Sequence, residues 1–187
     1  MTALYIVLGV VGFVLLALAL SYNRFVSQRN LIKDSWSNID TELRRRYDLI
    51  PNLVETVKGY AAHERELFEN VTRARAAAAA SQGPPEEQAT AEAPLVHGVR
   101  RLLAVAEDYP DLKASENFLE LQRQLTETED RLQAARRFYN GNVRDYNRRV
   151  QSFPSNLVAG VFEFVEAQFF EVEDAIRRPP RVALPEP

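Results

Sequence analysis

The chain has 187 residues, a net charge of −3 and no cysteine. After a membrane segment is set aside, this length leaves about one domain of ordinary size. The nearly balanced charge argues against nucleic acid as a partner, and the missing cysteines exclude disulfides, zinc–thiolate sites, iron–sulfur clusters and thiol nucleophiles. Few glycines and the absence of hairpin turn signals favour an all-α fold.

The N-terminal segment predicts a membrane-spanning helix. Residues 3–20 form an unbroken apolar run of the length that a span requires, ~18 residues or more. Tyr5 and Tyr22 lie near its ends, where aromatic side chains anchor a helix at the bilayer surfaces. The alternative is a cleaved signal peptide, because the tripeptide at 17–19 resembles a cleavage site. The length of the run and the lack of a preceding Lys or Arg favour a retained anchor over residues 1–22.

Flanking charge predicts the orientation of this anchor. Arg24, Arg29 and Lys33 follow the apolar run, whereas only the α-amino group precedes it. The excess of Lys and Arg on the cytoplasmic side of membrane proteins therefore predicts a cytoplasmic domain and an N-terminus outside.

A helical apolar stripe follows the anchor. Its steps alternate between three and four residues, as in a helix that faces a core or a coiled-coil partner. The members are Trp36, Ile39, Leu43, Ile50, Leu53, Val57, Tyr60, Leu67 and Val71. Pro51 lies beside the stripe and should kink a helix, because it lacks an N–H and clashes with the carbonyl of Tyr47. The stripe keeps its phase across Pro51, so we expect one long, kinked helix.

The remaining elements follow in chain order. Residues 76–94 change from alanines to Gly-Pro-Pro and small polar residues, which predicts a flexible connector. A short helix over residues 95–105 and a long helix over 114–152 should follow, and Pro154 should open a last, strongly apolar helix that reaches Phe170. We expect the bundle to occupy residues 23–171 and a disordered, proline-rich tail to occupy 172–187.

Several short motifs resemble the LemA family of bacterial membrane proteins. The most specific is the run RRYDLIPNLV at residues 45–54. The other matching pieces are Tyr22-Asn23, Trp36, Lys58-Gly59-Tyr60, His63-Glu64, Tyr109-Pro110, Leu112, Ala114, Phe118, Leu121, Leu125, Glu129, Ala135-Arg136, Tyr139-Asn140, Tyr146-Asn147, Pro154, Asn156 and Phe162. The resemblance covers nearly the whole chain from the anchor to Phe170.

The resemblance implies a fold and a location. It indicates one N-terminal span followed by an antiparallel four-helix bundle in the bacterial cytoplasmic (inner) membrane, in a family without an established biochemical activity. Relatives in magnetosome-forming bacteria are associated with building those membrane compartments, which implies a structural or membrane-organising role. The alanine run, the connector and the proline-rich tail depart from the family pattern and put loop contacts in doubt.

No catalytic or metal-binding motif is recognisable. A metalloprotease helix would need a second histidine four residues after His63, where Leu67 stands. A di-iron bundle would need a glutamate three residues before each histidine, but Tyr60 precedes His63 and Pro94 precedes His97. We therefore expect no enzyme activity, no metal and no cofactor.

Polar residues in the apolar stripes are the more informative candidates. Arg46 and Glu64 occupy core positions, where an unpaired charge costs several kcal/mol, so they should find partners. An ion pair that fixes the register of the bundle is favoured over a ligand site. Tyr60, Tyr139 and Tyr146 are expected to fill the core with satisfied hydroxyls. The asparagines of the two Tyr-Asn pairs, Asn140 and Asn147, should cap or bridge helices.

Two functions remain open at this point. The leading one is a non-enzymatic scaffold that contacts the lipid bilayer and self-associates or recruits an unknown protein partner. Its last helix has more large apolar residues than one packed face requires, and Phe170 is interpreted as facing outward. The other is a sensor or accessory subunit. A buried cluster of Arg46, Asp48, Asn52, His63 and Glu64 around an open cavity would favour it.

Overall fold

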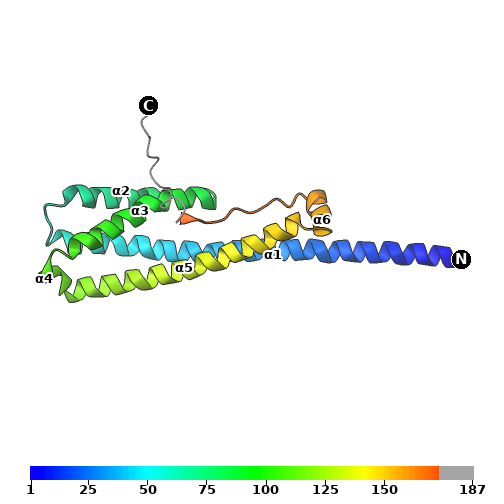
Figure 1. The fold of residues 1–187 in the computed structure, drawn as a ribbon, viewed down its shortest axis with the longest axis horizontal. Coiled ribbons are helices and arrows are strands. Elements are labelled where there is room, and N and C mark those ends of the chain that lie inside the picture. The colour runs from blue at the N-terminus through cyan, green and yellow to red at the C-terminus, as the bar shows by residue number, and fades with distance from the viewer. Residues whose placement is uncertain (173–187) are drawn as a thin grey trace, which may run out of the picture. The chain divides into compact units, whose positions relative to one another are not determined.

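The computed structural model describes residues 1–172, and every regular element among them is a helix (Figure 1). This confirms the all-α prediction. The helices are α1 (Thr2–Lys58), α2 (Arg65–Ala80), α3 (Pro85–Ala106), α4 (Pro110–Lys113), α5 (Glu116–Gln151) and α6 (Ser155–Val161). The predicted tail lies outside the described residues apart from Val172, which is buried.

The chain forms two compact units. Unit 1 consists of Met1–Asp40 and Ala134–Gln168, and unit 2 consists of residues 41–133 with 169–172 of the described chain. Helices α1 and α5 contribute to both units. In unit 1 the core contains Phe25, Tyr146, Val158, Ala159 and Phe164. In unit 2 the four longer helices α1, α2, α3 and α5 all supply buried apolar side chains.

The predicted membrane span is the first part of α1. An 18-residue window of this helix has a mean hydropathy of 2.8, and 0% of it is buried within the protein. A core helix of a soluble protein would bury such side chains. Within the described part of the chain, α1 is the one helix long and apolar enough to cross a membrane.

Helix α1 continues through Pro51, as the unbroken stripe predicted. Residue 51 cannot donate the backbone hydrogen bond that the carbonyl of Tyr47 would normally accept. Arg75 of α2 supplies a substitute, because its Nε donates to the Tyr47 carbonyl oxygen at 2.5 Å. A side chain from a second helix therefore satisfies the acceptor that the proline leaves free.

Helix α1 ends at Lys58, so the prediction of one helix as far as Val71 was wrong. Gly59 follows, and glycine stabilises a helix less than any residue except proline. The backbone N–H groups of Tyr60 and Ala61 both donate to the carbonyl of Val57, which makes a tight turn before α2. Ala61 is buried whereas Tyr60 is exposed. The spacing of apolar residues therefore continues across the turn. For this reason the periodicity of the sequence does not reveal the end of the helix.

The connector between α2 and α3 is much shorter than the predicted 76–94. Helix α2 includes all of the alanines to Ala80, and α3 begins at Pro85, which leaves residues 81–84 between them. Pro85 stands in the first turn of α3, where its missing N–H costs little. Glu86 and Glu87 in the same turn interact favourably with the positive end of the helix dipole.

Helix α6 also ends earlier than predicted. The N–H of Phe162 donates to the carbonyl of Val158, and that of Phe164 donates to the carbonyl of Ala159 at 2.9 Å. Between them Glu163 adopts the left-handed region, with φ of 56°. This pattern is a Schellman C-cap, whose left-handed position is usually a glycine. The chain leaves the helix there, so the expected helical phase does not extend to Phe170.

The contact between Arg75 and Tyr47 leads to a testable prediction. Arg75→Ala should lower the free energy of unfolding by roughly 1.5–3 kcal/mol, the usual value for a hydrogen bond with a charged donor. The loss should be smaller in a Pro51→Ala background, because residue 51 then has an N–H that can bond the same carbonyl. Arg73→Ala is the matched control, since Arg73 is exposed on the same helix. Chemical denaturation of the detergent-solubilised protein, followed by circular dichroism, measures each value. An equal loss in both backgrounds would contradict this account of Pro51.

Candidate functional site

A buried ion network lies in unit 2. Arg46 of α1 is 2% exposed, and its guanidinium contacts two carboxylates. Nη2 lies 2.7 Å from Oε2 of Glu92 on α3, and Nη1 lies 3.0 Å from Oε1 of Glu129 on α5. Glu92 is fully buried, whereas the Glu129 side chain is 41% exposed. The network therefore connects three helices and reaches the surface at Glu129.

Further donors surround the Glu92 carboxylate. The Tyr47 hydroxyl donates to Oε1 of Glu92. Nε2 of Gln88, one turn earlier on α3, lies 3.0 Å from the same oxygen and 3.1 Å from the carbonyl oxygen of Ala78 on α2. A buried carboxylate is tolerated only when charge and hydrogen bonds compensate its lost hydration, and both are present here.

This geometry is suited to fixing the relative positions of helices. Both oxygens of Glu92 are bonded to protein groups. The Nε atom of Arg46 is buried and has no hydrogen-bond partner among residues 1–172. The network therefore specifies the register of α1 against α3, because a shift of either helix would leave a charge buried without its partner.

The five residues whose clustering would have favoured a ligand site do not form a buried cluster. Arg46 is buried, but Asp48, Asn52 and His63 are exposed. Glu64 is half-buried at the start of α2 and makes no side-chain capping bond to that helix. The charged partners of Arg46 are Glu92 and Glu129, on two other helices. Pro51 is exposed beside this region.

Sequence reasoning missed Glu92, Gln88 and Tyr47. Glu92 and Gln88 lie in the segment that was interpreted as a connector, so their shared helix face was not considered. Their spacing of four residues was the available signal, since such residues are neighbours on a helix. Tyr47 precedes Asp48 in the quoted motif, but it falls outside the apolar stripe as drawn.

A second group of polar contacts lies in unit 1, where it attaches the chain after α6 to α5. The side-chain amide of Asn147 makes two hydrogen bonds with the backbone of Ala167. Its Nδ2 donates to the Ala167 carbonyl at 2.9 Å, and its Oδ1 accepts from the Ala167 N–H at 2.8 Å. The Tyr139 hydroxyl donates to the carbonyl of Gln168 at 2.9 Å. Burial raises the pKa of Tyr139 to about 12, so this hydroxyl remains protonated at neutral pH.

The other aromatic and asparagine residues singled out in the sequence differ in how far they are buried. Trp36 is half-buried and its ring centroid lies 5.4 Å from that of Tyr139. Tyr146 is buried against Phe25, and Asn140 is half-buried. Phe170 is 1% exposed, which corrects its interpretation as an outward residue. The correction follows from the early end of α6, since Phe170 was placed by a helical phase that does not hold there.

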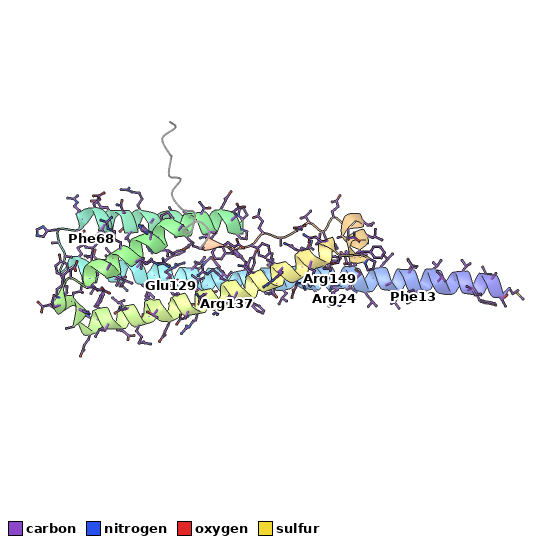
Figure 2. The ribbon with its side chains drawn as sticks, viewed as in Figure 1. Phe13, Arg24, Phe68, Glu129, Arg137 and Arg149 are labelled. Carbon is purple, nitrogen blue, oxygen red and sulfur yellow. The ribbon has the colours of Figure 1, made fainter. Side chains whose placement is uncertain are left out.

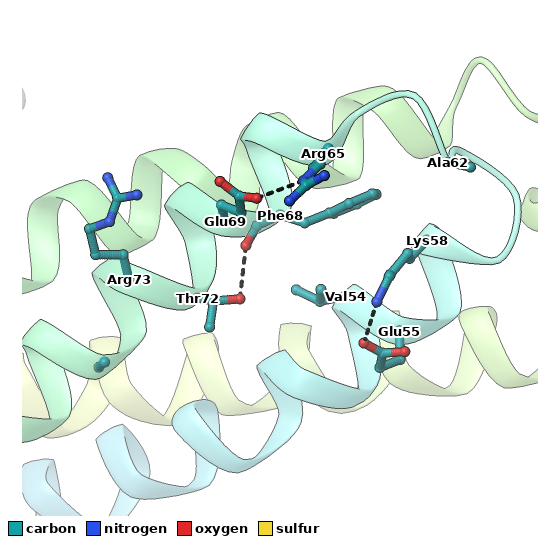
Figure 3. A pocket seen from close by; sticks show the side chains of 10 residues that line it. Val54, Glu55, Lys58, Ala62, Arg65, Phe68, Glu69, Thr72 and Arg73 are labelled. Carbon is teal, nitrogen blue, oxygen red and sulfur yellow. Dashed lines mark hydrogen bonds and ion pairs between the residues drawn. The ribbon is translucent and has the colours of Figure 1, made fainter.

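A groove in unit 2 lies between the end of α1 and α2 (Figure 3). Its volume is about 930 Å³. Val54 of α1 and Phe68 of α2 lie between the two helices, and the rim has ion pairs within single helices, Glu55 with Lys58 and Arg65 with Glu69. His97 is exposed and lines a different groove between α2 and α3.

The Arg46 network predicts unequal roles for its two carboxylates. Glu92→Ala should destabilise the protein by ~3–5 kcal/mol, because it leaves the Arg46 guanidinium buried without its main partner. Glu129→Ala is the matched control and should cost no more than ~1 kcal/mol, the range of a partly exposed pair. Urea denaturation of both variants in detergent measures the difference. Similar small losses at the two positions would show that the buried pair does not stabilise the fold.

Comparisons with known proteins agree with this architecture. A sequence model of the LemA family matches residues 35–184. The chain is 27% identical to magnetosome protein MamQ 2 of Paramagnetospirillum magneticum, over 90% of this chain and 71% of that protein. It is 23% identical to magnetosome protein MamQ of Magnetospirillum gryphiswaldense, with the same coverage. It is 24% identical to protein LemA of Metamycoplasma hominis, over 83% of this chain and 71% of that protein. Since the family match covers most of the sequence, the chain belongs to the LemA family.

Proposed function

We propose that this LemA-family protein is a non-enzymatic, self-associating scaffold that organises the bacterial inner membrane. It crosses the bilayer once and carries an antiparallel four-helix bundle on the cytoplasmic side. The observation that supports this reading best is the distribution of its side chains. The buried charges of Arg46 and Glu92 are paired with each other within the Arg46 network. Large apolar side chains, in contrast, are exposed along the anchor and beside it.

The polar residues support a structural role. Buried polar groups gathered around an open cavity would have favoured a ligand-binding sensor or accessory subunit. In the described chain Asp48, Asn52 and His63 face solvent, and the Glu92 carboxylate is occupied by protein donors. Buried polar groups with this degree of internal satisfaction fix one arrangement of helices and leave little capacity for a substrate.

The apolar residues support contacts beyond the single chain. The apolar 18-residue stretch of α1 is not buried by any other part of the described chain, and α6 exposes Leu157 and Val161. A common membrane confines identical copies to one surface and raises their effective concentration, so a weak contact between copies becomes sufficient for assembly. The relatives named as magnetosome proteins suggest the kind of membrane-bounded structure that such an assembly could organise.

A sensor or accessory subunit is the second candidate, and the groove between α1 and α2 favours it. The lining of this groove includes Val54 and Phe68, and four of its charged side chains form two ion pairs, Glu55 with Lys58 and Arg65 with Glu69. An apolar segment of a partner protein would fit this composition better than a small charged ligand would. Ala62 lines the same groove and is exposed, so Ala62→Trp would obstruct it without disturbing the core.

The proposed orientation can be tested with single cysteines, because the natural chain has none. A cysteine at Pro187 should be protected from an impermeant maleimide in intact cells, because the domain is proposed to be cytoplasmic. A cysteine at Thr2 should react. Labelling after permeabilisation is the control for reactivity at both positions. Reaction of the Pro187 variant alone in intact cells would reverse the orientation.

Self-association is tested by the mass of the solubilised protein. Size-exclusion chromatography with light scattering should give a protein mass of more than one chain, because the exposed apolar side chains of the anchor can pack between copies. The Ala62→Trp variant should have the same mass, since the groove is not needed for this assembly. A monomeric wild-type protein of unchanged helicity would contradict the scaffold. A monomer with a copurifying partner that Ala62→Trp releases would favour the accessory subunit.

A further inference from the structure

The segment around α6 exposes an unusual concentration of apolar surface in unit 1. Phe153 is 80% exposed, Leu157 60%, Val161 76% and Val165 75%. Phe162 is also exposed, and Glu163 is the one charged residue in the segment 153–165. Single exposed apolar residues are common on proteins, but a contiguous set of this size usually marks an interaction surface.

The opposite face of α6 explains why these side chains point outward. Val158 and Ala159 are buried in the core cluster with Phe25, Tyr146 and Phe164. Ala159 and Phe164 are joined by the terminal hydrogen bond of the C-cap. The short helix is therefore held by one apolar face and presents a second apolar face to its surroundings.

Aromatic contacts place this segment beside the end of the membrane span. The ring centroid of Tyr22 lies 4.8 Å from that of Phe162 and 5.6 Å from that of Phe164. Phe164 also stacks on Phe25, with centroids 4.7 Å apart. Figure 1 shows α6 beside α1 at this level.

The depth of these contacts matches the headgroup layer of a bilayer. The apolar run ends at Leu20, so Tyr22 and Phe25 lie roughly 3 and 7.5 Å beyond it at ~1.5 Å per helical residue. The polar layer of each leaflet is about 5–7 Å thick, from the difference between the full bilayer and its hydrocarbon core. The segment around α6 therefore contacts α1 at Tyr22, within this layer, and at Phe25, at its outer edge.

The surrounding charges agree with a lipid surface. Arg24 and Arg149 lie near this end of the anchor (Figure 2). The guanidinium of Arg29 lies 5.7 Å from the Phe164 ring centroid, and that of Arg149 lies 5.8 Å from the Phe25 centroid. Long arginine side chains near the end of a span can bring their guanidinium groups to lipid phosphates.

We propose that residues 153–165 form a second membrane contact, in which Phe153, Leu157, Val161, Phe162 and Val165 insert into the interface of the bilayer that α1 crosses. This inference rests on the membrane anchor of the proposed function but does not require self-association. Continuity with the span favours the bilayer over a second copy of the chain as the occupant. The segment then fixes the first part of the domain against the membrane, so that α1 does not act as a free tether.

Single-cysteine variants test this contact in the full-length protein. Val161→Cys and Val165→Cys are labelled with the environment-sensitive dye NBD and reconstituted into phosphatidylcholine–phosphatidylglycerol vesicles that contain nitroxide lipids. Phe138→Cys is the matched control, because Phe138 is an exposed apolar residue of unit 1. Its neighbour Tyr139 contacts Trp36, which lies roughly 24 Å beyond Leu20 along α1. Leu15→Cys reports on the span itself.

The expected result is a blue-shifted emission at positions 161 and 165 that the nitroxide lipids quench strongly, as at position 15. The label at 138 should stay water-like and unquenched. Labels at 161 and 165 that behave like the one at 138 would overturn the inference and leave the anchor intact. A blue shift that disappears on dilution with excess lipid would assign the surface to a second copy, which also overturns it. An unquenched label at position 15 would contradict the anchor and the inference together.

Discussion

The buried pair of Arg46 and Glu92 is the constraint on which unit 2 depends. Each charge alone would be strongly unfavourable in the core, and together they connect α1 and α3 at 2.7 Å. Tyr47 and Gln88 complete the coordination of the carboxylate. The neighbouring residue Pro51 then leaves the Tyr47 carbonyl free for Arg75 of α2. One turn of α1 thus carries the polar contacts that position α2 and α3, and Arg46 also reaches Glu129 of α5.

Unit 1, which contains the candidate membrane span, uses a different set of contacts. Its core combines Phe25 of α1 and Tyr146 of α5 with apolar residues of α6 and with Phe164, and contacts of Asn147 and Tyr139 with the backbone fix the chain that follows α6. These contacts place α6 beside Tyr22, immediately after the apolar run. The polar contacts described in the two units therefore hold helices and chain segments in place. The apolar surface that stays exposed is concentrated on the anchor and on the segment next to it.

The sequence predicted the long elements better than their ends. The apolar stripe correctly carried α1 through Pro51, since periodicity reports the buried face even where one backbone bond is missing. The same stripe failed at Gly59, because the turn kept the apolar phase. The end of α6 was hidden for another reason: its left-handed C-cap residue is Glu163, where a glycine would have given the usual signal.

The candidate site was predictable only in part. The core position of Arg46 indicated that a buried charge needs a partner, but it did not indicate which carboxylates on the other helices supply it. Glu92 was hidden in a segment whose Pro84, Pro85 and Pro94 resemble a loop, although Pro85 and Pro94 lie within α3. A partner on another helix is set by tertiary packing, which a single sequence with local patterns does not report.

The most direct measurement of the central claim is a double-mutant cycle between Arg46→Met and Glu92→Leu. The free energy of unfolding is measured for the full-length protein in detergent. If the buried pair organises the fold, each single variant loses several kcal/mol, and the double variant regains most of this loss because no unpaired charge remains in the core. Additive losses in the double variant would contradict the account, since they would show that the two side chains stabilise the protein independently.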